Sequence, residues 1–228
     1  VKGVDVAGIV CIDSTTTTKI KLDIDFFKNT AKSKKETNNE QIHKLFNKKI
    51  NDLKNRNIEI IFTDGSVKEG TTNAAFYYNN SSKRSNIIRS FNTEKLMSSM
   101  TAEIIIFDKA VDFALTYQMH RLAFLTHSKS DAIALTNAEL NYYLAIDIRN
   151  NIQNSSLEMV QIYFKPNHRG IHQSNVVDTA AKHADRNGEF FHLGWTMGDA
   201  SKEIERNRTA KWQEYYNPIS NEKEKKYY

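Results

Sequence analysis

The chain has little cysteine and no long apolar segment, and both absences narrow its possible functions. Its 228 residues contain one cysteine, Cys11, which excludes a disulfide within the chain and suits a reducing intracellular compartment, nuclear or cytoplasmic. No run approaches 18 apolar residues and no basic-then-apolar leader is visible, so the sequence predicts neither a membrane span nor a signal peptide. The chain starts at Val1 rather than at Met, and whether it is a processed product or a piece of a longer polypeptide stays open.

The net charge of +5 lies entirely upstream of residue 58. Residues 1–57 contain 12 Lys and Arg against 7 Asp and Glu, whereas residues 58–187 contain 13 against 13 and residues 188–228 contain 7 against 7. Cations that neutralise phosphates supply most non-specific affinity for nucleic acid, so the first stretch could serve as a basic arm. A solvated linker rich in Lys, Asn and Thr is the commoner alternative. The lysines concerned are Lys28, Lys32, Lys34, Lys35, Lys44, Lys48, Lys49 and Lys54.

A buried strand is predicted at residues 58–63, and an acid follows it directly. The segment IEIIFT is rich in β-branched and aromatic residues, which is typical of a strand buried on both faces. Asp64 then stands at the end of this strand, followed by Gly65 and Ser66. A carboxylate at such a place is costly to desolvate unless a metal or another cation compensates it. The alternative, which needs no function, is an ordinary Asp-Gly turn.

A second acid stands near the start of a predicted helix. Residues 98–117 have the apolar spacing of a helix, with Ser98 or Ser99 as its cap and Glu103 in its first turn. Glu103 precedes the apolar run IIIF, so we expect it to lean toward the core. A partner for the helix dipole is the alternative interpretation of an acid at this place.

Two further polar positions follow in the same alternation of elements. Residues 121–126 read as a second buried strand, and His127 comes directly after it. Residues 157–165 alternate apolar and polar side chains as a strand does, and a loop that contains His168 then enters a helix that carries Asp178.

This order of elements resembles the ribonuclease H family, in which four such positions form one acidic cluster. Asp64 in FTDGS, Glu103 in TAEIIIFDKA and Asp178 in HRGIHQSNVVDTAAKHA match three acids of the family. His168 matches the loop before the last acid. Where the family has its third carboxylate, this chain has His127 in THSKS.

The resemblance implies an α/β, ribonuclease-H-like fold: a five-stranded mixed sheet flanked by helices, with three antiparallel strands followed by two parallel ones. We expect the strands at about residues 58–63, 73–79, 85–91, 121–126 and 157–165. The expected organisation is a ribonuclease-H-like domain at 58–187, a basic N-terminal extension with an amphipathic helix at 1–57, and a charged helical C-terminal extension at 188–228.

A finer likeness is to the ribonuclease H domains of non-LTR, LINE-type retrotransposons. Those domains are commonly followed by a charged helix that contains a tryptophan, as residues 199–216 do here, and preceded by an amphipathic stretch, as at residues 39–55. The likeness implies a transposon-derived origin. It also implies a reverse transcriptase, or another part of a longer polypeptide, as a partner.

In this family two divalent ions hydrolyse a phosphodiester bond in the RNA strand of an RNA–DNA hybrid. The resemblance implies that Asp64 bridges both ions, that Glu103 and the residue at 127 hold one of them, and that Asp178 holds the other. It gives His168 a part in moving the proton or releasing the product, although a loop histidine without a role is the alternative.

Histidine at position 127 changes the chemistry expected of the site. A neutral imidazole is a softer ligand than a carboxylate and removes one negative charge, so manganese or zinc would tolerate it better than magnesium. His127 could instead stay protonated beside Asp64 and Glu103 as a built-in counter-ion, which would leave the site inactive. Two hypotheses follow: a metal-dependent endonuclease, Mg²⁺- or Mn²⁺-dependent and attenuated by His127, or a catalytically silent domain that binds nucleic acid or protein.

Overall fold

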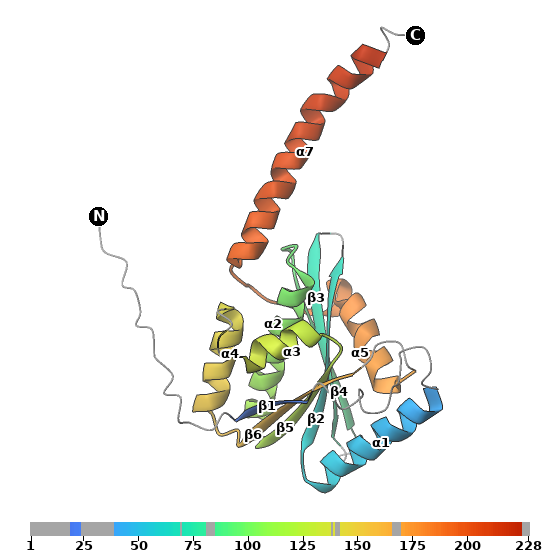
Figure 1. Cartoon of the computed structure of the whole chain (residues 1–228), viewed down its shortest axis with the longest axis vertical. Helices are drawn as coiled ribbons and strands as arrows, with labels where there is room; N and C mark the ends of the chain where they lie inside the picture. Colours follow the sequence, from blue (N-terminus) through green and yellow to red (C-terminus); the bar gives the residue numbers. More distant parts are fainter. Residues whose placement is uncertain are drawn as a thin grey trace, which may run out of the picture.

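The computed structural model of the chain describes residues 19–23, 39–68, 70–80, 85–137, 139, 142–165 and 170–224. A mixed sheet flanked by helices forms the body of the molecule (Figure 1). Its strands are β1 (Ile20–Asp23), β2 (Glu59–Lys68), β3 (Thr71–Asn80), β4 (Ser85–Thr93), β5 (Arg121–Thr126), β6 (Met159–Phe164) and β7 (Glu189–Phe190). Its helices are α1 (Asn39–Asn55), α2 (Ser99–Thr116), α3 (Lys129–Thr136), α4 (Tyr143–Asn154), α5 (His172–Lys182), α6 (Ala184–Asn187) and α7 (Met197–Glu224). Within these ranges, no helix combines the length and hydrophobicity that a membrane span requires.

The sheet contains the five predicted strands and one more strand at each edge. Its order is β1-β6-β5-β2-β3-β4-β7, in which β2, β3 and β4 are antiparallel neighbours while β5 and β6 run parallel to β2. This topology confirms the predicted ribonuclease-H-like fold. The prediction of five strands was wrong, because β1 pairs with β6 and β7 pairs with β4. The added strands have only four and two residues, too few for an apolar pattern to mark them in the sequence.

Different helices cover the two faces of the sheet, as Figure 1 shows: α2, α3 and α4 lie on one side, and α1 and α5 on the other. The first face carries the larger apolar core, in which Phe76, Phe113 and Phe124 are buried. The second face carries a core that includes Phe62 and Tyr163. Successive residues of a strand point to opposite faces, so this division also decides on which side each functional side chain emerges.

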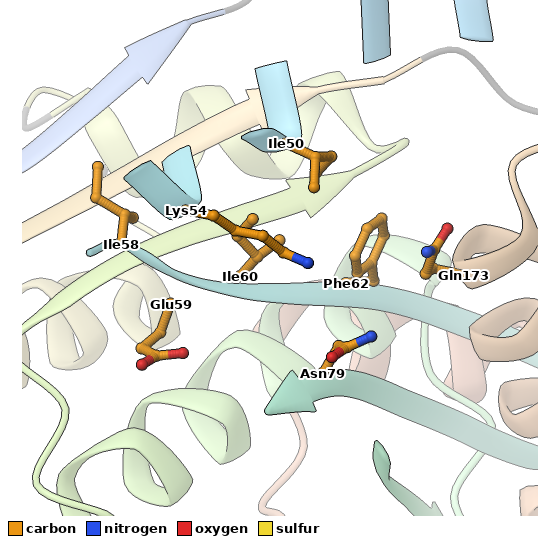
Figure 2. A pocket seen from close by; sticks show the side chains of 8 residues that line it. All are labelled: Ile50, Lys54, Ile58, Glu59, Ile60, Phe62, Asn79 and Gln173. Carbon is orange, nitrogen blue, oxygen red and sulfur yellow. The ribbon is translucent and has the colours of Figure 1, made fainter. Parts of the chain in front are cut away.

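Helix α1 packs on the sheet beside α5. Its Phe46 and Leu53 are buried in the second core, and the rings of Phe46 and Phe62 are 6.1 Å apart. Figure 2 shows Ile50 and Lys54 of α1 over Ile60 and Phe62, where a pocket opens between helix and sheet. The described part of residues 1–57 thus supplies both an edge strand and a covering helix, while the domain boundary at residue 57 stays a prediction.

The lysines of the predicted basic arm differ in their surroundings. Lys44, Lys48 and Lys54 are exposed on α1. The ammonium nitrogen of Lys49 lies 4.4 Å from the ring centroid of Tyr163 and is therefore committed to packing on the sheet. The remaining four, Lys28, Lys32, Lys34 and Lys35, lie outside the described residues.

Helix α7 carries a buried acid in its first turn and then projects away from the sheet (Figure 1). Asp199 is 2% exposed and accepts hydrogen bonds from the backbone N–H of Ser98 at 2.8 Å and from the hydroxyls of Thr101 at 2.6 Å and Thr196 at 2.7 Å. Burial opposes ionisation of Asp199, but these bonds outweigh it and hold the pKa of its carboxyl below the usual range. The first turn of α7 is therefore fixed to the N-terminus of α2.

Candidate metal centre

Asp64 lies inside β2 rather than at its end. Pairing with the parallel strand β5 stops at Phe62 and Leu125, whereas pairing with the antiparallel strand β3 continues to Lys68. The prediction that Asp64 closes the strand was therefore wrong, and so was the alternative of an Asp-Gly turn. What does end at this point is the parallel part of the strand, which leaves the 5% exposed Asp64 at the edge of the second core.

Gly65 allows α2 to approach β2 closely. A Cβ atom at Gly65 would lie 2.8 Å from the backbone nitrogen of Glu103 and 2.9 Å from the Cβ of Ala102, which is closer than real side chains come. The start of α2 agrees with the prediction, since Ser98 is its cap and accepts a hydrogen bond from the backbone N–H of Thr101. Helix and strand therefore meet where each of them carries an acid.

Glu103 is buried, with 3% of its surface exposed, as its apolar neighbours predicted. Because α2 begins at Ser99, Glu103 lies beyond the first turn, so its predicted place there was wrong and it is no partner for the orphan N–H groups of the helix. The hydroxyl of Thr126, at the end of β5, donates to Oε2 of Glu103 at 3.5 Å. The carboxyl thus points across to the strand that precedes His127.

His127 brings the two acids together. Its Nδ1 lies 3.3 Å from Oδ1 of Asp64, and its Nε2 lies 3.3 Å from Oε1 of Glu103. One ligand atom from each of the three residues lies within 4.8 Å of the others. Residues that are up to 63 positions apart in the chain, one on a strand, one on a helix and one directly after a strand, therefore form one cluster.

The two carboxyls of this cluster are hard to ionise. Burial, followed by the negative charge of Asp178, raises the pKa of Asp64 to about 7. Burial, followed by the charges of Asp64 and Asp131, raises the pKa of Glu103 well above its ordinary value. A nearby cation stabilises the ionised form of acids in such surroundings most strongly. Groups with strongly shifted pKa values often cluster at functional sites.

Asp178 lies near the cluster but is not part of it. It stands on α5, its side chain is 37% exposed, and its Oδ2 lies 2.7 Å from the ammonium nitrogen of Lys182. Its charge acts on Asp64, yet it is absent from the group of clustered ligand atoms found among the described residues. The other residue assigned by resemblance, His168, falls in residues 166–169, outside the described part of the chain, and its role stays a prediction.

Two buried charged residues near the cluster were not predicted. Lys165 is 2% exposed directly after β6, and Asp131 on α3 is fully buried and accepts a hydrogen bond from the hydroxyl of Ser128. Both act electrostatically on Glu103. Strand alternation could have revealed Lys165, which shares a face with Tyr163, whereas Asp131 reads as an ordinary acid in the first turn of a helix.

The three clustered residues fit a single divalent ion. Carboxylate oxygen and imidazole nitrogen both ligate such ions, and the spacing of the three ligand atoms lets one ion contact all of them. The nitrogen ligand favours Mn²⁺ or Zn²⁺ over Mg²⁺. The arrangement is therefore suited to polarising an oxygen atom and to activating a water molecule.

Neither the family models nor the curated proteins give a match to this sequence. Among solved structures, the chain is similar to ribonuclease H1 from the halophilic archaeon Halobacterium salinarum, with 12% sequence identity and a TM-score of 0.46. The alignment covers 57% of this chain and 98% of that chain.

Proposed function

We propose that this chain is a ribonuclease-H-type, metal-dependent nuclease that cuts the RNA strand of RNA–DNA hybrids and is attenuated by His127. The observation that carries the proposal is the cluster of Asp64, Glu103 and His127 within 4.8 Å of one another. Burying two carboxyls side by side is unfavourable unless a cation compensates them, so a cation-dependent role is the simplest reason for the arrangement.

A bound divalent ion would supply Lewis-acid polarisation of the phosphodiester and a more acidic water. Asp64 and Glu103 would hold it through oxygen atoms, with His127 as the third ligand. Asp178 would complete the site from α5, where its greater exposure leaves it on the side that a nucleic-acid strand can reach. The exposed lysines Lys44 and Lys48 of α1 would add non-specific attraction for phosphates.

Attenuation follows from the position of the imidazole. Both ring nitrogens of His127 face a carboxylate oxygen at 3.3 Å, so a protonated ring can act as a cation between Asp64 and Glu103 without any metal. The same geometry supports the second candidate function, a catalytically silent domain that binds nucleic acid or protein. A transposon-derived origin, with a reverse transcriptase as a partner, belongs to the proposal in either case.

Cleavage of a labelled RNA–DNA hybrid in Mn²⁺ and in Mg²⁺, at matched ionic strength, tests the proposal. We expect cleavage in Mn²⁺, at least about tenfold weaker cleavage in Mg²⁺, and a loss on the order of 100-fold in Asp64→Asn. Asp185→Asn, which changes an exposed acid of α6, is the matched control and should leave cleavage unchanged. Binding of the hybrid without cleavage in either ion would favour the silent domain.

A further inference from the structure

Lys165 is a buried cation that the proposed chemistry does not use. Its side chain is among the largest fully buried ones, although it follows directly on the last residue of β6. Its backbone N–H donates to the carbonyl oxygen of Thr126 at 2.8 Å, so Lys165 lies beside the end of β5, where His127 follows. Lysine is almost never fully buried unless an anion compensates its charge.

Strand alternation places Lys165 on the same side of the sheet as Asp64. On β6, Tyr163 belongs to the core under α1 and α5, and Lys165, two residues later, shares its face. On β2, Phe62 and Asp64 share that face by the same alternation. The parallel register aligns β2, β5 and β6, so His127 and Lys165 follow the ends of β5 and β6 and lie next to Asp64, where the parallel pairing of β2 stops.

The electrostatic surroundings of Lys165 agree with this placement. Burial lowers the pKa of its ammonium group, while the charges of Asp64, Glu103 and Asp178 act in the opposite direction and favour the cation. In return, the charge of Lys165 makes both Asp64 and Glu103 easier to ionise. The buried charge of Lys165 therefore favours the ionised form of both buried acids of the cluster.

We propose that Lys165 is a tethered counter-ion of Asp64 and Glu103 that competes with a divalent ion for these two acids. A positive charge fixed near the carboxylates stabilises them without metal and repels a metal that approaches. The competition rests on the proposed function, because it concerns the same metal site. The counter-ion role does not, since it is a property of the metal-free chain. Metal binding would then be weak for two reasons. His127 replaces a carboxylate ligand, and the positive charge of Lys165 repels the ion.

A double-mutant cycle in the metal-free full chain tests the counter-ion role. Lys165→Met should lower the urea midpoint of unfolding, because Asp64 is then buried without its cation, and adding Asp64→Asn should restore at least half of that loss. Lys211→Met is the control, because Lys211 is exposed on α7, which projects away from the sheet, so its effect and that of Asp64→Asn should add. If Lys165→Met does not fold, folding of the double variant supports the role. Additive effects, or a double variant equally unfolded, overturn it.

Mn²⁺ binding, followed by electron paramagnetic resonance, tests the competition. Lys165→Met should bind Mn²⁺ at least tenfold more tightly than the unaltered chain, while the control Lys211→Met should change the affinity less than threefold. Equal affinities in all three proteins would overturn the competition. If neither the unaltered chain nor Lys165→Met binds Mn²⁺, the proposed function falls together with the competition, while coupling in the metal-free cycle would still establish the counter-ion.

Discussion

The acids of the candidate site are held in two different ways. Asp64 and Glu103 are 5% and 3% exposed, and their places are set by a strand in the middle of the sheet and by the helix that packs on it. Asp178 stands on α5 with 37% of its side chain exposed and is paired with Lys182 four residues later. One part of the site is therefore built by the core, and the other by the surface of a single helix.

This difference separates two roles. The buried part is electrostatically costly, because its carboxyls have lost water and lie close to one another. It should decide whether a metal binds at all. The exposed part keeps its water and its own cation, so it should matter for the substrate side of the reaction more than for holding the first ion.

The largest expected difference between the two parts is in metal affinity. Asp64→Asn should weaken Mn²⁺ binding by on the order of 100-fold or more, because affinity follows the number and charge of the ligands. Asp178→Asn should weaken it by less than about tenfold, since Asp178 is not among the clustered ligands of the described residues. Isothermal titration with Mn²⁺ measures both values. Equal losses would show that the two parts form one site.

Stability of the metal-free chain should fall as the pH rises from about 4 to about 7. The pKa of Asp64 is raised from 3.8 to about 7, by burial first and by Asp178 second, so the folded chain keeps a proton in this interval that the unfolded chain has lost. Deprotonation then favours unfolding, by up to about 4 kcal/mol at about 1.4 kcal/mol for each unit.

Urea unfolding at a series of pH values checks this prediction. Asp64→Asn removes one titrating group and should make the fall shallower, and Glu103, whose pKa is also raised by burial, should account for the fall that remains. A fall of the same depth in Asp64→Asn would show that the carboxyl of Asp64 is not buried in the way described.

A side chain added at Gly65, where β2 and α2 approach closely, should disrupt the buried acids Asp64 and Glu103 and leave the exposed Asp178 unaffected. Gly65→Ala places a methyl group 2.8 Å from the backbone of Glu103, and we expect a loss of about 1–3 kcal/mol in the free energy of unfolding together with weaker Mn²⁺ binding. Gly194→Ala is the matched control, because no heavy atom lies within 4 Å of its added Cβ, and it should change stability by less than about 0.5 kcal/mol. Similar losses in both variants would contradict the close approach.

The smallest effect should come from the exposed pair. Lys182→Ala removes the ion pair with Asp178, whose side chains are 55% and 37% exposed, and should change the free energy of unfolding by less than about 1 kcal/mol. Chemical denaturation at low and high salt measures this change. A loss above about 2 kcal/mol would mean that this exposed ion pair contributes as much to the free energy of unfolding as the buried residues do.

Periodicity and motif order were enough to predict the central elements of the fold. The bounds of β5 agree with the prediction at residues 121–126, and Ser98 caps α2 as its sequence indicated. These elements have strong local signals, namely a continuous apolar run and a cap residue. The edge strand β1 has none, because its four residues pair with β6, which lies more than 130 residues later in the chain.

The residues of the site could be predicted where an acid stands next to an apolar run in the sequence. They could not be predicted where their positions depend on tertiary packing. Asp64 and Glu103 were found from their apolar neighbours, but the extent of β2 depends on β3, which continues the pairing past the point where β5 stops. Lys165 looks like a polar strand end in the sequence. Strand alternation places it on the face of Tyr163, but its burial depends on the neighbouring strands β5 and β2, which are distant in the sequence.

Restoring the third carboxylate tests the central claim most directly, namely that the cluster is an intact metal site apart from position 127. His127→Asp places an acid between Asp64 and Glu103, whose oxygens now face the imidazole at 3.3 Å. Cleavage of a labelled RNA–DNA hybrid in Mg²⁺ should rise by at least about 100-fold, which corresponds to about 2.7 kcal/mol of transition-state stabilisation, and adding Asp64→Asn should abolish the gain. A folded, hybrid-binding His127→Asp variant without any gain would contradict the claim.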